Sequence, residues 1–67
     1  MIVWICGQWV SQFAHWELQG IFSNEYKAIA ACQTSLYFIA PIEIDKECPR
    51  DNRYMPGAYY PLAEGMQ

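Results

Sequence analysis

Basic residues are scarce in this sequence. Its 67 residues include four Lys and Arg side chains against seven Asp and Glu, which gives a formal net charge of −3 at pH 7. Proteins that bind the phosphates of DNA or RNA usually carry clustered positive charge, because neutralising the phosphates supplies much of the binding affinity. The charge balance therefore predicts no direct contact with nucleic acid.

Features typical of membrane, metal and catalytic proteins are also missing. Residues 1–6 are apolar but far too short to span a bilayer, and they lack the basic start and long apolar run of a signal peptide. No CxxC or HxxxH pair brings two metal ligands together. No nucleophile elbow, phosphate loop or dinucleotide fingerprint occurs. We expect a cytoplasmic, non-enzymatic protein with no membrane segment, no metal and no cofactor.

The three cysteines fit the cytoplasmic prediction. An odd number is a poor basis for a disulfide framework, and isolated thiols are common in reducing compartments. We expect Cys6 and Cys32 in the core, one on a buried strand and the other on the buried face of a helix. The only histidine, His15, is expected on the solvent side of a strand.

Apolar and aromatic residues, by contrast, are plentiful. Hydrophobic residues make up 54% of the chain and aromatic residues 16%, although a chain of this length buries only about 60% of its unfolded surface. So small a core cannot enclose that much apolar side chain. Part of it is therefore expected on a surface that meets a partner, most simply a second copy of the chain in a homodimer.

Three strands are predicted from the hydrophobic pattern. Residues 2–6 form a continuous β-favouring run, which is typical of a central strand covered on both faces. Residues 13–21 alternate between apolar and polar side chains and predict a second strand, with Leu18 pointing into the core and Trp16 packed between sheet and helix. Residues 36–44 predict a third, and Pro41 marks it as an edge strand because proline cannot donate a ladder hydrogen bond.

One helix is predicted between the second and third strands, over residues 24–33. Ser23 is a suitable N-cap, and Glu25 places a carboxylate at the positive end of the helix dipole. A right-handed crossover through this helix places the first strand between the other two. The prediction is an α+β fold of β-β-α-β order, with a mostly antiparallel three-stranded sheet of order 2-1-3 and one helix on one face.

The chain changes character after this core. Residues 1–45 form the β-β-α-β core, and residues 46–67 form a loop and an extended aromatic C-terminal arm within the same single domain. Pro56-Gly57 fits the centre of a type II turn, because glycine supplies the positive φ angle. The arm can lie across its own sheet or reach that of a neighbour, and the sequence leaves both open.

Aromatic residues outside the predicted strands are the first candidates for a binding surface. Trp9 falls in the connection after the first strand, and Tyr54, Tyr59 and Tyr60 fall in the arm. Trp and Tyr are over-represented among the residues that dominate protein interfaces. Ordinary burial within the chain is the competing interpretation, and the sequence favours neither.

Charged residues near the start of the arm are the second candidates. Glu43, Asp45 and Glu47 alternate along the end of the third strand, so they would point the same way and could bind a hard cation, mimic nucleic-acid phosphates or meet a basic protein surface. A solvated edge that discourages wrong strand pairing is the simpler interpretation. Arg50 and Arg53 lie near the arm tyrosines and could bind a nucleotide or phosphate, although no glycine-rich loop accompanies them.

One stretch resembles a known group of proteins. Residues 16–28 read WxLxGIFSxExKA, followed by Ala31-Cys32 and by Tyr37-Phe38-Ile39. This pattern resembles small uncharacterised proteins of bacteriophages and bacteria, catalogued as domains of unknown function, and the likeness covers about residues 1–45. The resemblance implies a strand pair, a helix start and a last strand. It also implies an accessory factor that binds and blocks a host component, and it carries over no catalytic residues.

Three hypotheses for function follow. The first is a phage-type accessory protein, non-enzymatic and dimeric, that binds and inhibits a host protein of antiviral defence in the host cytoplasm. The second is a binder that sequesters a small ligand such as a nucleotide in a pocket between subunits, using Arg50, Arg53 and arm tyrosines. The third is a structural protein that only oligomerises.

Overall fold

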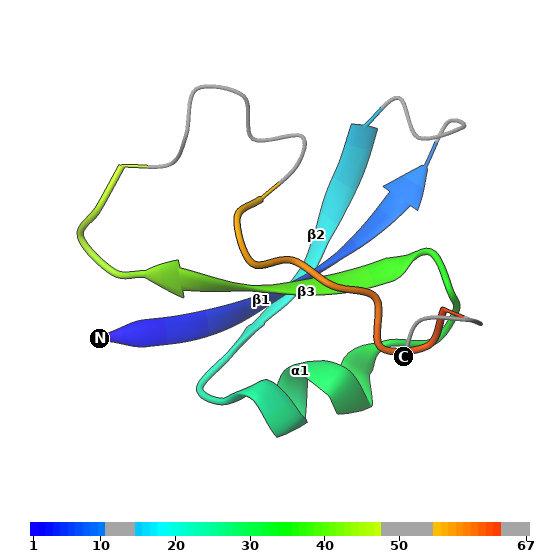
Figure 1. Ribbon diagram of the computed structural model, residues 1–67, viewed down its shortest axis with the longest axis horizontal. Helices are drawn as coiled ribbons and strands as arrows, with labels where there is room; N and C mark the ends of the chain where they lie inside the picture. Colours follow the sequence, from blue (N-terminus) through cyan, green and yellow to red (C-terminus); the bar gives the residue numbers. More distant parts are fainter. Residues whose placement is uncertain (11–14, 48–54, 64–67) are drawn as a thin grey trace.

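Three antiparallel strands and one short helix form the core of the protein (Figure 1). The computed structural model describes residues 1–10, 15–47 and 55–63. The elements are β1 (Ile2–Val10), β2 (His15–Phe22), α1 (Glu25–Ala31) and β3 (Tyr37–Glu43). The sheet order is β2-β1-β3, and β1 is antiparallel to both neighbours. The predicted α+β fold and strand order are confirmed.

β1 is longer than the sequence predicts. The sequence indicates an end at Cys6, but the strand continues to Val10, so Trp9 lies within the sheet opposite Trp16 and the prediction of Trp9 in a connection is wrong. Gly7 continues the strand because its missing side chain leaves room for neighbouring rings. A Cβ atom at Gly7 would lie 2.7 Å from Phe38 Cζ and 2.8 Å from Trp16 Cε3. Two aromatic rings therefore pack directly onto the backbone of β1.

The helix is shorter than predicted, since it begins one residue later, at Glu25, and ends two residues earlier, at Ala31. Its N-cap is Asn24, whose side-chain oxygen accepts a hydrogen bond from the backbone N–H of Lys27 at 2.9 Å. Ser23 is not the cap. It lies between Asn24 and the end of β2 at Phe22, which pairs with Trp4 of β1. Glu25 lies in the first turn, as predicted. With seven residues α1 is short, and no helix in the described part of the chain is long and apolar enough to cross a membrane.

The buried residues form two clusters, one on each face of the sheet. We call the first the helix-side cluster, because it joins α1 to the sheet through Cys6, Ala28, Cys32, Tyr37 and Ile39. The second, the arm-side cluster, contains Ile5, Trp9, Phe38, Ala40 and Met55. The prediction of Cys6 and Cys32 in the core is confirmed. Trp16 packs with the arm-side cluster rather than beneath the helix, where the sequence predicts it.

An irregularity in the pairing of β1 with β2 places two exposed apolar side chains on the same face of the sheet. The register shifts between Cys6 and Gly7, so that Gly7 pairs with Leu18 while Ile5 pairs with Ile21. Paired residues share a face of the sheet, so Leu18 and Ile21 both lie on the arm side although three positions separate them. They are 53% and 61% exposed, which corrects the expectation that Leu18 points into the core.

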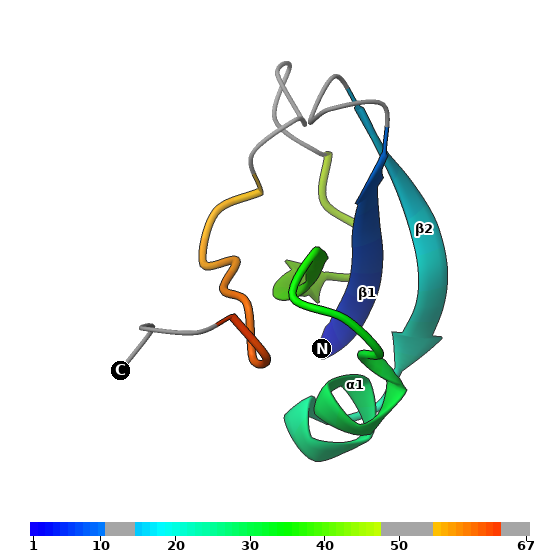
Figure 2. The ribbon, with the colours of Figure 1, turned by 90° about the vertical axis from the view of Figure 1, so that its right-hand side faces the viewer.

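Residues 55–63 of the C-terminal arm fold back onto their own sheet. The N–H of Ile39 donates to the carbonyl oxygen of Tyr59 at 2.9 Å, and the N–H of Tyr59 donates to that of Ile39 at 3.0 Å. The arm thus joins β3 on the side away from β1, and Figure 2 shows it passing beside the sheet opposite β2. Because N–H groups two residues apart point the same way, Pro41 directs its nitrogen outward, and β3 loses no bond to β1.

The turn before this contact matches its sequence prediction. The N–H of Ala58 donates to the carbonyl oxygen of Met55 at 3.2 Å, and Gly57 has a φ angle of 78°. A positive φ angle at the third position is the mark of a type II turn, so Pro56-Gly57 forms the predicted centre. The turn lies against β3, since a Cβ atom on Gly57 would be 3.1 Å from Cγ of Pro41.

Gly7→Ala is expected to destabilise the fold by roughly 1–3 kcal/mol, because the added methyl group overlaps the buried ring of Phe38 and the partly buried ring of Trp16, which cannot both move away. Urea unfolding followed by tryptophan fluorescence measures this loss. Gln8→Ala is the matched control, since Gln8 is the next residue of β1 and is only partly buried. Equal unfolding midpoints for the two variants would contradict the proposed role of Gly7.

Candidate binding pocket beside the C-terminal arm

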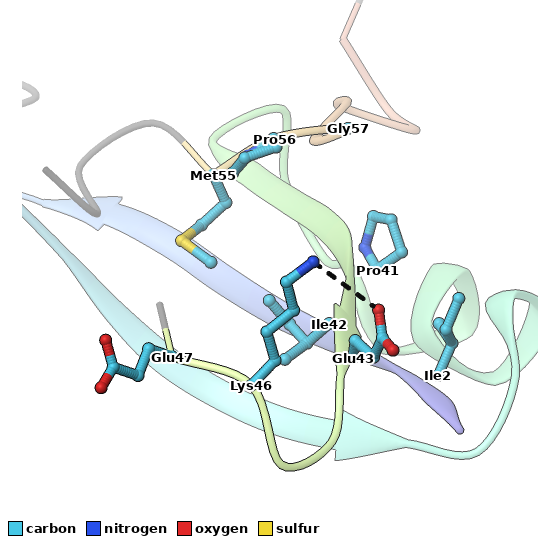
Figure 3. A pocket seen from close by; sticks show the side chains of 9 residues that line it. All are labelled: Ile2, Pro41, Ile42, Glu43, Lys46, Glu47, Met55, Pro56 and Gly57. Carbon is cyan, nitrogen blue, oxygen red and sulfur yellow. Dashed lines mark ion pairs between the residues drawn. The ribbon is translucent and has the colours of Figure 1, made fainter. Parts of the chain in front are cut away.

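A hollow of about 520 Å³ lies where β3, the following turn and the arm meet (Figure 3). Its walls are mostly apolar and come from three separate segments: Ile2 of β1, Pro41 and Ile42 of β3, and Met55, Pro56 and Gly57 of the arm. Met55 also belongs to the arm-side cluster and is 7% exposed, so the hollow reaches the core. The volume falls within the range of pockets that bind small molecules.

Three charged residues complete the pocket on its solvent side, namely Glu43, Lys46 and Glu47, and all three are exposed. Lys46 Nζ lies 4.0 Å from Glu43 Oε1, and Figure 3 shows these two side chains pointing toward each other. An exposed pair at this distance contributes little to stability. The rim as a whole carries one more negative charge than positive, which favours a cationic group on the ligand.

The acidic residues do not form the continuous row that the sequence predicts. β3 ends at Glu43, and the chain turns at Ile44 and Asp45, where Asp45 has a φ angle of 68°. Alternation along a strand therefore stops before Asp45. Glu43 and Glu47 come together at the pocket through the turn, whereas Asp45 is not among the lining residues.

Trp9 and Tyr60 contact each other instead of facing outward together. Trp9 is 3% exposed, and its Nε1–H donates to the hydroxyl oxygen of Tyr60 at 2.6 Å. Both rings also pack near Phe38, with ring centroids 6.1 Å and 6.0 Å from it. The structure therefore places these two predicted binding residues in the contact that holds the arm to the sheet.

Tyr59 holds the arm on the opposite face. Its hydroxyl group donates a hydrogen bond to Oε2 of Glu25 in the first turn of α1, and its ring packs against the helix-side cluster. This hydrogen bond, followed by burial and the carboxylate charge, raises the pKa of Tyr59 from 10.0 to about 12. Adjacent residues of an extended segment point to opposite faces, so Tyr59 and Tyr60 bind the arm on both sides of β3.

The two core cysteines are weak nucleophiles. Cys6 Sγ and Cys32 Sγ lie 3.9 Å apart, and both are free thiols. Burial raises the pKa of both thiols, that of Cys32 to about 12, where the neighbouring Cys6 adds to the effect. Because the thiolate is the nucleophile and the metal ligand, these cysteines are poor candidates for catalysis.

The remaining candidates fall into two groups. His15 is exposed on β2, as predicted, and no group of three His, Cys, Asp or Glu residues in the described ranges is arranged to hold a metal ion. Arg50, Arg53 and Tyr54 lie outside the described residues. The structure therefore brings together Glu43, Glu47 and Lys46 at one pocket, and Trp9, Tyr59 and Tyr60 at the arm contact.

Sequence reasoning missed the pocket itself. Its apolar walls lie at positions 2, 41–42 and 55–57, and nothing in their local pattern shows that they meet. One signal was available, because a proline-glycine turn and a proline-containing edge strand both disfavour regular pairing and leave space at their junction.

Tyr59→Phe is expected to lower the free energy of unfolding at neutral pH by about 1 kcal/mol, because it leaves Glu25 without its hydrogen-bond donor. Since folding raises the pKa of Tyr59, the wild-type contribution is complete below pH 10 and is lost as the pH rises from 10.0 to about 12.

Urea unfolding at a series of pH values tests this expectation. The difference between wild type and Tyr59→Phe should shrink over that alkaline range. Tyr26→Phe is the control, since Tyr26 lies on the same helix as Glu25 and is 83% exposed. A difference that stays constant to pH 12 would show that the hydroxyl group of Tyr59 does not act through Glu25.

Comparisons of this chain with protein-family models, with curated proteins and with solved structures gave no match, so the resemblance to small phage and bacterial proteins stays a prediction.

Proposed function

We propose that this chain is a non-enzymatic binding protein that captures a partner protein through the pocket beside its arm. The ligand is an apolar side chain of the partner, flanked by a lysine or arginine. In the setting that the resemblance implies, the partner is a host protein, capture inhibits it, and the chain acts as a homodimer in the host cytoplasm.

The observation that carries this proposal is the combination of an apolar hollow with an acidic rim. The walls from Ile2, Ile42 and Met55 favour an aliphatic or aromatic group, since burying it removes apolar surface from water. Glu43 and Glu47 then favour a cation beside that group. The exposed rim opens the pocket to solvent, so a side chain on the surface of a second protein can enter.

The same rim argues against a phosphate in this pocket. Two carboxylates repel a nucleotide phosphate, and Lys46 already lies beside one of them. The nucleotide-binding alternative depends on Arg50 and Arg53, which lie outside the described residues. It stays a prediction, as does the purely structural oligomer.

Selection from a random peptide library against the immobilised protein tests the proposed ligand. Peptides that bind should share an aliphatic or aromatic residue next to a lysine or arginine. Glu47→Lys should weaken their binding roughly tenfold, because it reverses one of the rim charges, and tenfold corresponds to about 1.4 kcal/mol.

Tyr26→Lys with Gln33→Lys is the matched control for this experiment. It makes the same change in net charge at two exposed positions on and just after α1, which line neither the pocket nor β2. Equal losses for the two variants would show that only overall charge matters. Selection of no common motif, or of an acidic one, would overturn the proposed ligand.

A further inference from the structure

β2 is the open edge of this sheet. Within residues 1–10, 15–47 and 55–63, β2 pairs only with β1, whereas the outer side of β3 is bonded to Tyr59 of the arm. In Figure 2, β2 forms the side of the molecule away from the arm. An edge strand presents unpaired N–H and C=O groups that can pair with another chain. The described part of the protein therefore offers one edge that is bonded and one that is open.

The open edge also carries exposed apolar side chains. Leu18 and Ile21 are 53% and 61% exposed and lie on the same face, because the register shift between Cys6 and Gly7 brings Ile21 onto the arm side, where Leu18 already lies. Natural edge strands commonly place charged residues at such positions to prevent pairing. β2 carries a single acidic residue, Glu17, and no lysine or arginine.

We propose that two copies of this chain pair through β2, antiparallel across a two-fold axis, so that Leu18 of each copy lies opposite Ile21 of the other. In this register Glu17 lies opposite Phe22, so no two like charges meet. The two sheets become one continuous six-stranded sheet. Leu18 of each copy then covers Ile21 of the other, so the same apolar contact forms twice across the axis.

A second copy fits this edge better than an unrelated strand for two reasons. The pattern is self-complementary, because the two exposed apolar residues lie at positions that a two-fold axis brings together. Among the described residues, the outer edge of β3 is bonded to the arm at Ile39 and lacks an N–H at Pro41, so pairing of β2 with β2 closes the assembly at two chains instead of letting it grow into a fibre.

This proposal rests on the homodimer proposed above but not on the pocket. None of the pocket-lining residues lies on β2, so loss of dimerisation and loss of peptide binding are separate results. A chain of this length also benefits from assembly, since it buries only about 60% of its unfolded surface when it folds alone.

Sedimentation equilibrium of the full chain, from micromolar to millimolar concentration, tests the proposal. The wild type should reach twice the 7.8 kDa mass of one chain and no more. Leu18→Lys with Ile21→Lys should weaken the dimer at least about tenfold, because lysines opposite each other repel and the apolar contact is lost.

Tyr26→Lys is the matched control, since Tyr26 is an exposed aromatic residue on α1, and it should leave the dimer unchanged. Far-ultraviolet circular dichroism checks that each variant is folded. If the double variant is unfolded, hydrogen exchange of wild-type β2 replaces it, and the amides of residues 15–22 should lose protection on dilution.

Three results would overturn the proposal. The first is a wild-type monomer at every concentration. The second is a dimer that survives the double variant, or whose β2 amides exchange equally at all concentrations. The third is a mass that keeps rising with concentration, which would show pairing that does not close.

Discussion

The pair of backbone hydrogen bonds between Ile39 and Tyr59 is the contact on which the rest of this structure depends. It fixes the arm along β3, and from that position Tyr59 reaches Glu25 on one face while Tyr60 reaches Trp9 on the other. The same placement brings Met55 into the arm-side cluster. A core too small to enclose its aromatic residues is thus completed by a segment distant in the sequence.

The sequence predicts this core well, because the relevant signals are local. Continuous and alternating apolar runs identify the strands, and crossover handedness gives their order. Cys6 and Cys32 are recognised as core residues because each falls on a predicted buried face. The Pro56-Gly57 turn is recognised because only glycine readily adopts its φ angle of 78°.

What the sequence does not show depends on contacts between distant segments. Gly7 looks like the start of a connection, and only the rings of Phe38 and Trp16 above it explain why β1 continues. The position of Ile21 on the same face as Leu18 follows from a register shift, which alternation alone cannot reveal. The pocket is invisible for the same reason, since three separate segments of the chain form it.

The positions of the pocket and the open edge relate the two proposals. The pocket lies beside β3 and the arm, whereas β2 lies on the other side of β1. In the proposed dimer β2 becomes central, and the two copies of β3 form the outer parts of the joined sheet. The pockets then lie away from the new contact, so dimerisation does not block the pockets and a bound partner does not block dimerisation.

Two pockets on one sheet can bind a partner that presents two matching sites, and binding at the first raises the effective concentration at the second. In the proposed dimer the arm determines this arrangement, because its bonds to Ile39 cover part of the edge of β3, and β2 is then the edge through which the two copies pair.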